Sequence, residues 1–528
     1  MRTRSSARKI QLLIAAVVMT CSVLACSQGY ITPFELTMTA NASTAVPTFE
    51  PPTATNTDVP TATAMIETPL PTFTDVPQRT KTPIFTETID PLATGKPPII
   101  YYTQSGDTLP SITGRFGVAA KEIQSSEPLP ETGLINPGIL LTIPDRIENA
   151  TPYLIAMPDS EVVYSPSASD FDIDAYINQA GGYLSRYTHE VAGKLMTGSE
   201  IVNLVALENS ANPRLLLAIL EYKSHWVLGE PTNLAESDYP MGYIKLEYQG
   251  LYYQLSWAVE QLSIGYYGWR AGNLTEVTFK DNSVKRLNPQ LNAGTVALQY
   301  LFAQWYEPAE WNGALYGDQS MPKLMTSMFG DFWARSKTVE PLYPVNLAQP
   351  TLELPFYRGR TWSFTGGPHP AWGPGGALAA LDFAPPSIKS GCTQSDEWVT
   401  AMAPGLVVRT GSGVVIEDLD GDGDESTGWV IMYLHIETRD KVALGTVLDT
   451  NSKIGHPSCE GGQAEGTHLH VARKFNGEWM LAGGPVPFNL SGYVASNGAE
   501  EYEGTLFNGS TLITASPISA PKSLITRP

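Results

Sequence analysis

The sequence predicts a multidomain protein with a small βααβ module, a mainly helical middle domain and an all-β C-terminal domain whose antiparallel sheet lines a groove. The chain has 528 residues, which is too many for one hydrophobic core. Between residues 150 and 345, apolar side chains recur at helical spacing. Between residues 350 and 515, glycines, turns and short β-rich runs replace that pattern, as expected of an all-β domain.

An export signal is predicted for residues 1–26. Basic residues precede an apolar run from Ile10 to Val18, which is short for a stable membrane span. The run leads to Val23-Leu24-Ala25-Cys26, which resembles a bacterial lipobox. This resemblance implies lipidation of Cys26 and a membrane-anchored, extracytoplasmic protein. An ordinary signal peptide and an uncleaved anchor are the alternatives.

Residues 27–98 are predicted to be a disordered stalk. Thr and Pro dominate this stretch, and no sustained apolar period is available to build a core. Pro-rich chains favour the extended polyproline II conformation. The segment is therefore expected to act as a semi-stiff tether between the lipid anchor and the folded domains.

Residues 99–146 are predicted to form a compact unit. Ile99–Tyr102 and Leu140–Pro144 are strand-like and enclose two short helices, the first of which Asp107 or Thr108 can cap. This order is that of a βααβ module.

Three motifs of this unit resemble a LysM module, namely Tyr102–Leu109, Phe116-Gly117-Val118 and Pro137–Leu140. The resemblance implies binding of the N-acetylglucosamine-containing glycans of peptidoglycan and chitin. One departure is that Ser125-Ser126-Glu127 replaces the asparagine usually found after the second helix. The fold is therefore better supported than sugar binding, and a degenerate spacer module is the alternative.

The predicted helical domain spans residues 150–345. Ser199 can cap a helix that runs through Leu207, and Asn212-Pro213 reads as the cap and first residue of the next helix. Further helices are expected around Leu251–Leu262 and Asn292–Trp305.

The segment Asn212–Leu220 is similar to one in lysozyme-like lytic transglycosylases. In that family a catalytic Glu stands directly before a Ser, whereas here Lys223 precedes Ser224. A lysine cannot be the acid that glycosidic cleavage needs, and Glu221 lies about 200° round the helix from that position. The domain is therefore expected to be non-catalytic, either a glycan-binding module or an unrelated helical spacer.

Histidines concentrate in the last domain, which holds five of the seven: His369, His435, His456, His468 and His470. A zinc motif of the HExxH type is excluded, because the sequence starting at His189 has Gly193 where the second His belongs. His189 is expected to be a surface residue.

A metal site is predicted instead from the C-terminal histidines and one aspartate. His468 and His470 lie two apart in a strand-like run, so both should point to one face. His369 follows the turn Gly366-Gly367-Pro368. Asp382 stands in an otherwise apolar strand, where a lone carboxylate is costly unless a charged partner or a metal meets it.

These residues resemble the signature of the lysostaphin and β-lytic class of zinc metallopeptidases. His369 and Asp382 are thirteen residues apart, as in the β-lytic branch. The resemblance implies one zinc ion per chain on His369, Asp382 and His470, and catalytic roles for His435 and His468. Two histidines and one carboxylate leave a fourth position for water, the pattern of a catalytic zinc site.

The resemblance implies the function of a zinc-dependent endopeptidase that cleaves cross-link or glycine-rich peptides of peptidoglycan. The alternative is a non-enzymatic wall-binding protein or an activator of another wall hydrolase. Peptidoglycan and the membrane are the expected partners. The formal net charge of −20 argues against nucleic acid.

Cys392 and Cys459 remain in the exported body and are expected to form a disulfide, with His456 in a structural role beside it. The run Asp418–Asp424 imitates the start of an EF-hand loop, but Trp429 stands where the bidentate acid belongs. Weak calcium binding at Asp418, Asp420 and Asp422 is one interpretation, and an exposed hairpin loop is the favoured one.

Overall fold

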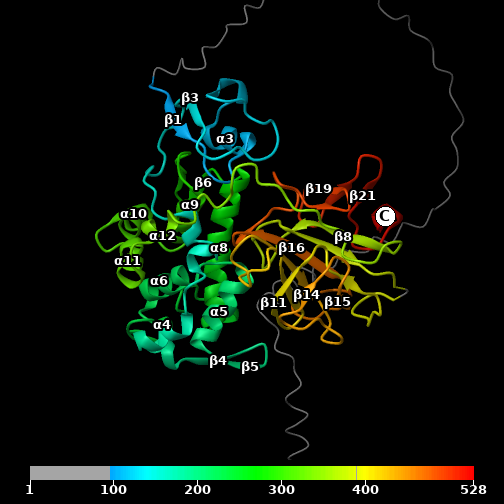
Figure 1. The fold of residues 1–528 in the computed structure, drawn as a ribbon. Coiled ribbons are helices and arrows are strands. Elements are labelled where there is room, and N and C mark those ends of the chain that lie inside the picture. The colour runs from blue at the N-terminus through cyan, green and yellow to red at the C-terminus, as the bar shows by residue number, and fades with distance from the viewer. Residues whose placement is uncertain (1–95, 388) are drawn as a thin grey trace, which may run out of the picture.

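The computed structural model describes residues 96–387 and 389–528. These residues form a small N-terminal module, a helical region and a β region (Figure 1). The predicted export signal at 1–26, with Cys26, and the predicted stalk up to residue 95 lie outside the described residues. In the described part, no helix has the length and hydropathy needed to cross a membrane.

The N-terminal module is an antiparallel sheet of order β1-β3-β2 with one α-helix packed against it. Its elements are β1 (Ile99–Tyr102), α3 (Leu109–Phe116), η1 (Ala120–Glu122), β2 (Gln124–Ser125) and β3 (Leu140–Ile143). The second predicted helix is a single 3₁₀ turn. Thr108 caps α3, because its side chain accepts a hydrogen bond from the Ser111 N–H, while Asp107 forms a buried ion pair with Arg115.

The helical region begins after short 3₁₀ turns and includes two small hairpins. Its helices are α4 (Ile173–Ala180), α5 (Gly198–Asn209), α6 (Pro213–Ser224), α7 (Leu234–Asp238), α8 (Leu251–Ala271), α9 (Ala293–Ala303), α10 (Pro308–Tyr316), α11 (Met321–Phe329) and α12 (Phe332–Ser336). The 3₁₀ turns are η2 (Asp159–Glu161), η3 (Pro166–Ala168), η4 (Tyr183–Arg186) and η5 (Leu246–Tyr248). The hairpins are β4 (Thr188–Val191) with β5 (Lys194–Thr197), and β6 (Glu276–Thr278) with β7 (Val284–Arg286).

The predicted caps of two helices had different outcomes. Asn212 caps α6 as expected, since its side chain accepts a hydrogen bond from the Arg214 N–H. The prediction that Ser199 caps α5 was wrong, because Thr197 does so in a reciprocal capping box with Glu200. A Thr followed three residues later by Glu satisfies two otherwise free N–H groups, which Ser199 cannot do.

The β region is built on a large antiparallel sheet of order β14-β11-β12-β13-β16-β9-β8-β22, with β17 paired to β16. Its strands are β8 (Thr361–His369), β9 (Ala380–Ala384), β11 (Gly405–Thr410), β12 (Val414–Asp418), β13 (Trp429–Leu434), β14 (Val447–Leu448), β16 (Leu469–Phe475), β17 (Glu478–Trp479) and β22 (Leu524–Thr526). Smaller sheets join β10 (Val399–Thr400) to β15 (Lys453–Gly455), and β18 (Asn489–Leu490) through β19 (Tyr493–Asn497) and β20 (Gly504–Phe507) to β21 (Leu512–Thr514). A 3₁₀ turn, η6 (Pro521–Ser523), precedes β22.

The sheet extends beyond residue 515, where the sequence placed the end of the domain. Strand β22 pairs with β8, for example through Ile525 opposite Trp362, and both side chains are fully buried in one core. The last residues therefore complete the edge of the sheet.

The helical region covers one face of this sheet, so the two regions share a core (Figure 1). Along β13, Val430 and Met432 belong to the core that includes the helices, whereas Ile431 and Tyr433 belong to the core on the opposite face. Successive side chains of a strand point to opposite faces, which explains this alternation. The helical and β regions are thus joined by apolar packing rather than by a flexible linker.

A buried ion-pair network fastens α8 to the sheet. The Arg270 guanidinium lies 2.9 Å from the Asp159 carboxylate and 2.9 Å from the Glu478 carboxylate, which belongs to β17. All three side chains are at least nine-tenths buried. Each buried charge therefore relies on the others for compensation.

We predict that Arg270→Leu lowers the free energy of unfolding by about 3–5 kcal/mol, because it leaves two buried carboxylates without their cation. The measurement is the urea midpoint of unfolding followed by circular dichroism. The control is Arg186→Leu, which removes an exposed ion pair with Glu230 and should leave the midpoint nearly unchanged. Equal midpoints for the two variants would contradict the role given to Arg270.

Candidate metal centre

The five residues that the sequence predicted to form a site come together at the strands β8, β9, β13 and β16. His470, in β16, pairs directly opposite Asp382, in β9. His369 ends β8. His435 directly follows β13, and His468 directly precedes β16. Positions far apart in the chain therefore meet because their strands are neighbours in one sheet.

The two glycines before His369 allow β8 to approach β9 closely. The pairing of β8 with β9 shifts register between Phe364 and Gly366 and again between Gly366 and His369. A Cβ on Gly366 would lie 2.5 Å from Asp382 Oδ2, and a Cβ on Gly367 would lie 2.3 Å from a backbone oxygen. The irregular strand re-aims His369 toward the aspartate, a common use of bulges beside active sites.

Backbone carbonyls orient the rings of His369 and His470. His369 Nδ1 lies 2.7 Å from the Gly367 carbonyl oxygen, and His470 Nε2 lies 3.1 Å from the Ala371 carbonyl oxygen. A carbonyl oxygen can only accept, so each of these nitrogens carries the N–H. His369 Nε2 and His470 Nδ1 are left as the atoms whose lone pairs face the site.

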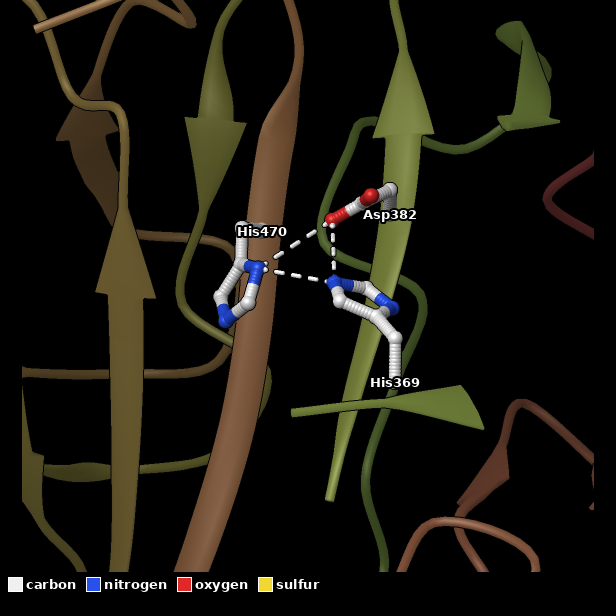
Figure 2. Close-up of side chains that lie close together, drawn as sticks. All are labelled: His369, Asp382 and His470. Atoms are coloured by element: carbon white, nitrogen blue, oxygen red, sulfur yellow. Dashed lines mark hydrogen bonds and ion pairs between the residues drawn. The ribbon is translucent and has the colours of Figure 1, made fainter. Parts of the chain in front are cut away.

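These two nitrogens and one oxygen of Asp382 converge on a single point (Figure 2). His369 Nε2 lies 3.1 Å from His470 Nδ1, and each nitrogen lies 3.3 Å from Asp382 Oδ1. Asp382 Oδ1 is buried and accepts no hydrogen bond from any described residue. Three acceptors facing one another in a buried site require a cation.

The donor set fits a zinc ion. Zinc takes imidazole nitrogen and carboxylate oxygen ligands at about 2.0–2.1 Å, which places tetrahedral ligand atoms about 3.3–3.4 Å apart. The observed separations of 3.1–3.3 Å match this spacing. Three protein ligands leave the fourth position open, as in catalytic rather than structural zinc sites.

Charge interactions within the cluster are strong. Burial raises the pKa of Asp382, but the nearby His369 and His468 outweigh it and hold that pKa well below its usual value. Burial lowers the pKa of His369, but Asp382 outweighs it and raises that pKa. A proton and a metal ion therefore compete for the lone pair of His369.

His435 and His468 lie beside the three ligands, with their rings 4.5 Å apart. Each ring has Nδ1 near a backbone carbonyl oxygen, at 2.9 Å from Glu460 for His435 and 2.7 Å from Gly466 for His468. The Nε2 atoms are consequently the free acceptors, and His468 Nε2 lies 3.7 Å from Asp382 Oδ1. Burial, together with His468, lowers the pKa of His435 to about 3, so its ring is neutral at neutral pH.

Tyr502 is a site residue that sequence reasoning missed. Its ring stacks on His369, with centroids 4.2 Å apart and planes 18° from parallel. Its N–H donates to the Pro368 carbonyl oxygen, and its own carbonyl accepts from the Gly367 N–H. The residue lies in the loop between β19 and β20, where no local pattern marks it. Only the packing of that loop on β8 reveals it.

Other predicted residues lie outside this cluster. The predicted disulfide between Cys392 and Cys459 is present. His456 is buried against Trp398, and its Nδ1 lies 2.8 Å from the Glu397 carbonyl oxygen. His189 is half-buried in β4 and stacks on a tyrosine rather than lying free on the surface.

The acidic run Asp418–Asp424 begins at the last residue of β12 and continues into the loop of the hairpin between β12 and β13. Its carboxylates accept hydrogen bonds from backbone N–H groups of the same loop, for example Asp418 from Gly423. Asp418, Asp420 and Asp422 lie near one another, with Asp418 buried and the other two exposed. This arrangement is that of the hairpin loop favoured by the sequence.

The sequence is similar to those of known proteins. A family profile described as "LasA, N-terminal domain" matches residues 155–343. A β-lytic metalloendopeptidase of Lysobacter enzymogenes is 29% identical over 154 residues, which cover 29% of this chain and 83% of the relative. Protease LasA of Pseudomonas aeruginosa is 24% identical over 370 residues, which cover 66% of this chain and 82% of the relative.

The chain is a relative of the lysostaphin/β-lytic-type metallopeptidases. The resemblance predicted from the sequence is thereby confirmed. Among solved structures, the M23 metalloprotease pseudoalterin covers 32% of this chain and 96% of its own, with 23% identity and a TM-score of 0.27. The catalytic domain of lysostaphin from Staphylococcus simulans covers 23% and 87%, with 21% identity and a TM-score of 0.17.

We predict that Gly366→Ala weakens zinc binding by the protein about 10- to 100-fold, because the added methyl group displaces the Asp382 carboxylate. Competition with a fluorescent chelator measures the affinity. Gly313→Ala in α10 is the matched control, since a Cβ there meets no atom within 4 Å. Wild-type affinity in Gly366→Ala would show that the carboxylate has room to move.

Proposed function

We propose that this protein is a zinc-dependent endopeptidase that cleaves cross-link or glycine-rich peptides of peptidoglycan. The observation that carries the proposal is the convergence of three buried metal-binding atoms, from His369, Asp382 and His470, beside two further imidazoles. The similarity to the Lysobacter protein, which is a metalloendopeptidase, supports the reaction class.

A zinc ion on these ligands would supply a Lewis acid, polarising the scissile carbonyl and lowering the pKa of a water molecule to about 7. The protein supplies the proton transfers. His435 Nε2 is neutral and free to accept, so it can take a proton from the attacking water. Once protonated, the same atom can pass that proton to the leaving amine.

His468 adds a second base or hydrogen-bonding group next to His435. Its side chain is the most exposed of the five, at 17%, and its Nε2 points toward the ligands. The backbone carbonyls that hold both Nδ1–H groups fix the rings before substrate arrives. Such preorganisation means that little reorientation is needed during the reaction.

The remaining parts of the chain suit a role at the bacterial wall. We propose that Cys26 carries a lipid anchor on the extracytoplasmic side of the membrane and that the module at 99–146 is a LysM-like glycan-binding unit. We also propose that the helical region does not cleave glycans. Two observations support this: Lys223 stands at the position of the expected acid, and the Glu221 carboxylate is used to accept the N–H groups of Val227 and Leu228.

We predict that purified protein carries about one zinc ion per chain, and that His470→Ala loses both this zinc and the hydrolysis of purified peptidoglycan. Plasma emission spectrometry measures the metal, and mass spectrometry of the released muropeptides identifies the bond that is cut. His189→Ala, which alters a histidine outside the cluster, should retain both. Retained hydrolysis in His470→Ala would contradict the assignment of His470 as a ligand of a catalytic zinc ion.

We predict that His435→Ala retains zinc but lowers kcat about 100- to 10,000-fold on a glycine peptide, because the ring acts on protons rather than on the metal. Zinc content and kcat are measured on the same preparation. Loss of zinc in this variant would mean that His435 is a ligand. Full zinc in the wild type without turnover of any peptide would favour the alternative of a wall-binding or activating protein.

A further inference from the structure

A pocket of about 330 Å³ lies in the helical region. It is formed by η5 and the segment before it, by α8 and by the residues that follow α9. Its lining residues are Gly242, Tyr243, Tyr248, Trp257, Glu260, Gln261, Gln304 and Trp305. Its volume is at the lower end of the range for pockets that bind small molecules, about 300–1,000 Å³, which suits one small ring.

One wall of the pocket is a continuous set of aromatic rings. Tyr243 stacks on Trp257 with centroids 4.6 Å apart and planes only 6° from parallel. Tyr248 meets Tyr243 edge-on at 4.8 Å, and Trp305 lies 6.0 Å from Trp257. Tyr243 and Tyr248 are only partly buried, and aromatic rings can pack against the C–H face of a pyranose ring.

A buried glutamine fixes this wall before any ligand binds. The Gln254 side chain is fully buried in α8, and its Nε2 donates to the carbonyl oxygens of Tyr243 and Tyr248, both at 2.8 Å. Its Oε1 accepts from the N–H groups of Met241 and Tyr243. The segment that carries the two tyrosines is therefore tied to α8, which lowers the entropy lost on binding.

The polar groups of the pocket are available to a ligand. Neither the Glu260 carboxylate nor the nearly buried Gln261 carboxamide forms a hydrogen bond with any described residue. The Trp305 indole N–H is buried and likewise lacks a partner in the described part of the chain. Buried polar groups are normally paired, so the unpaired indole N–H of Trp305 is the group here that calls for a hydrogen-bond acceptor, while Glu260 and Gln261 offer further polar contacts to a ligand with hydroxyl or amide groups.

The charges around the pocket favour a neutral ligand. Lys223 Nζ lies 4.5 Å from the centre of the Trp305 ring, and Lys245 Nζ lies 4.8 Å from that of Tyr243. These cations would repel an ammonium ligand, whereas Glu260 would repel an anion. Burial raises the pKa of Glu260 to about 7, so near neutral pH this carboxyl group both donates and accepts hydrogen bonds.

The pocket adjoins the loop that leads from His369 to Asp382. A Cβ on Gly375, in that loop, would lie 3.0 Å from Ile264 Cδ1 and 3.4 Å from Glu260 Cγ. The same loop supplies the Ala371 carbonyl that orients His470. One polymer could therefore occupy the pocket and the metal centre together.

We propose that this pocket binds one sugar ring of an N-acetylated glycan strand whose attached peptide is presented to the metal centre. Sugar binding stands on the pocket itself, whereas the identification of the strand as peptidoglycan rests on the proposed function. The helical region would then hold the glycan without cleaving it and so select peptides attached to a sugar chain.

The test is hydrogen exchange of the full zinc-loaded protein with and without chitotetraose, an oligomer of N-acetylglucosamine. We expect slower exchange in residues 241–249 and 300–306, and at least tenfold weaker calorimetric affinity at this site in Tyr248→Ala and Gln304→Ala. Tyr153→Ala is the matched control, because this tyrosine is 72% exposed and outside the pocket. Protection confined to 99–146, or unchanged affinity in both pocket variants, would overturn the proposal.

A parallel titration with tetramethylammonium tests the competing chemistry of an aromatic cage for cations. Protection of the same segments by tetramethylammonium but not by the sugar would overturn the proposal as well. Wild-type protein is also assayed on sugar-free pentaglycine. If the sugar protects the pocket but pentaglycine is not hydrolysed, the proposed function fails and the pocket assignment stands. If pentaglycine is hydrolysed but the sugar gives no protection, the pocket assignment fails and the proposed function stands.

Discussion

Hydrogen bonds from imidazole N–H groups to backbone carbonyls determine what the site can do, because they decide which nitrogen of each ring faces inward. The Gly367 and Ala371 carbonyls turn the lone pairs of His369 and His470 toward Asp382. The same device orients His435 and His468. Carbonyls are fixed by the backbone, so ring orientation follows directly from the positions of strand β8 and of the loops that carry the other carbonyls.

Those loops are positioned by a sheet that is covered by helices. His470 and Asp382 lie on the sheet face that carries Ala472 and Ala380, and these alanines belong to the core shared with the helical region. The metal centre is thus built on the face that α8 and its neighbours pack against. The loop between His369 and Asp382 also borders α8, since a Cβ on Gly375 would lie 3.0 Å from Ile264 Cδ1.

Local signals predicted much of the secondary structure. The Asn212-Pro213 start of α6 depends on near neighbours in the chain, so one segment suffices to recognise it. Errors arose where two local options competed. Thr197 and Ser199 can both cap a helix, and only Thr197 has Glu200 at the right offset.

The sequence by itself determined the chemistry of the site, because ligand type is a property of residue identity and HxH spacing places two rings on one strand face. Tertiary structure alone decided that Asp382 lies opposite His470 and that Tyr502 stacks on His369. These pairs depend on strand order and loop packing over long sequence separations. No periodicity within a segment encodes such contacts. They form only when the strands pair in one register, which is the register that buries the apolar face of the sheet.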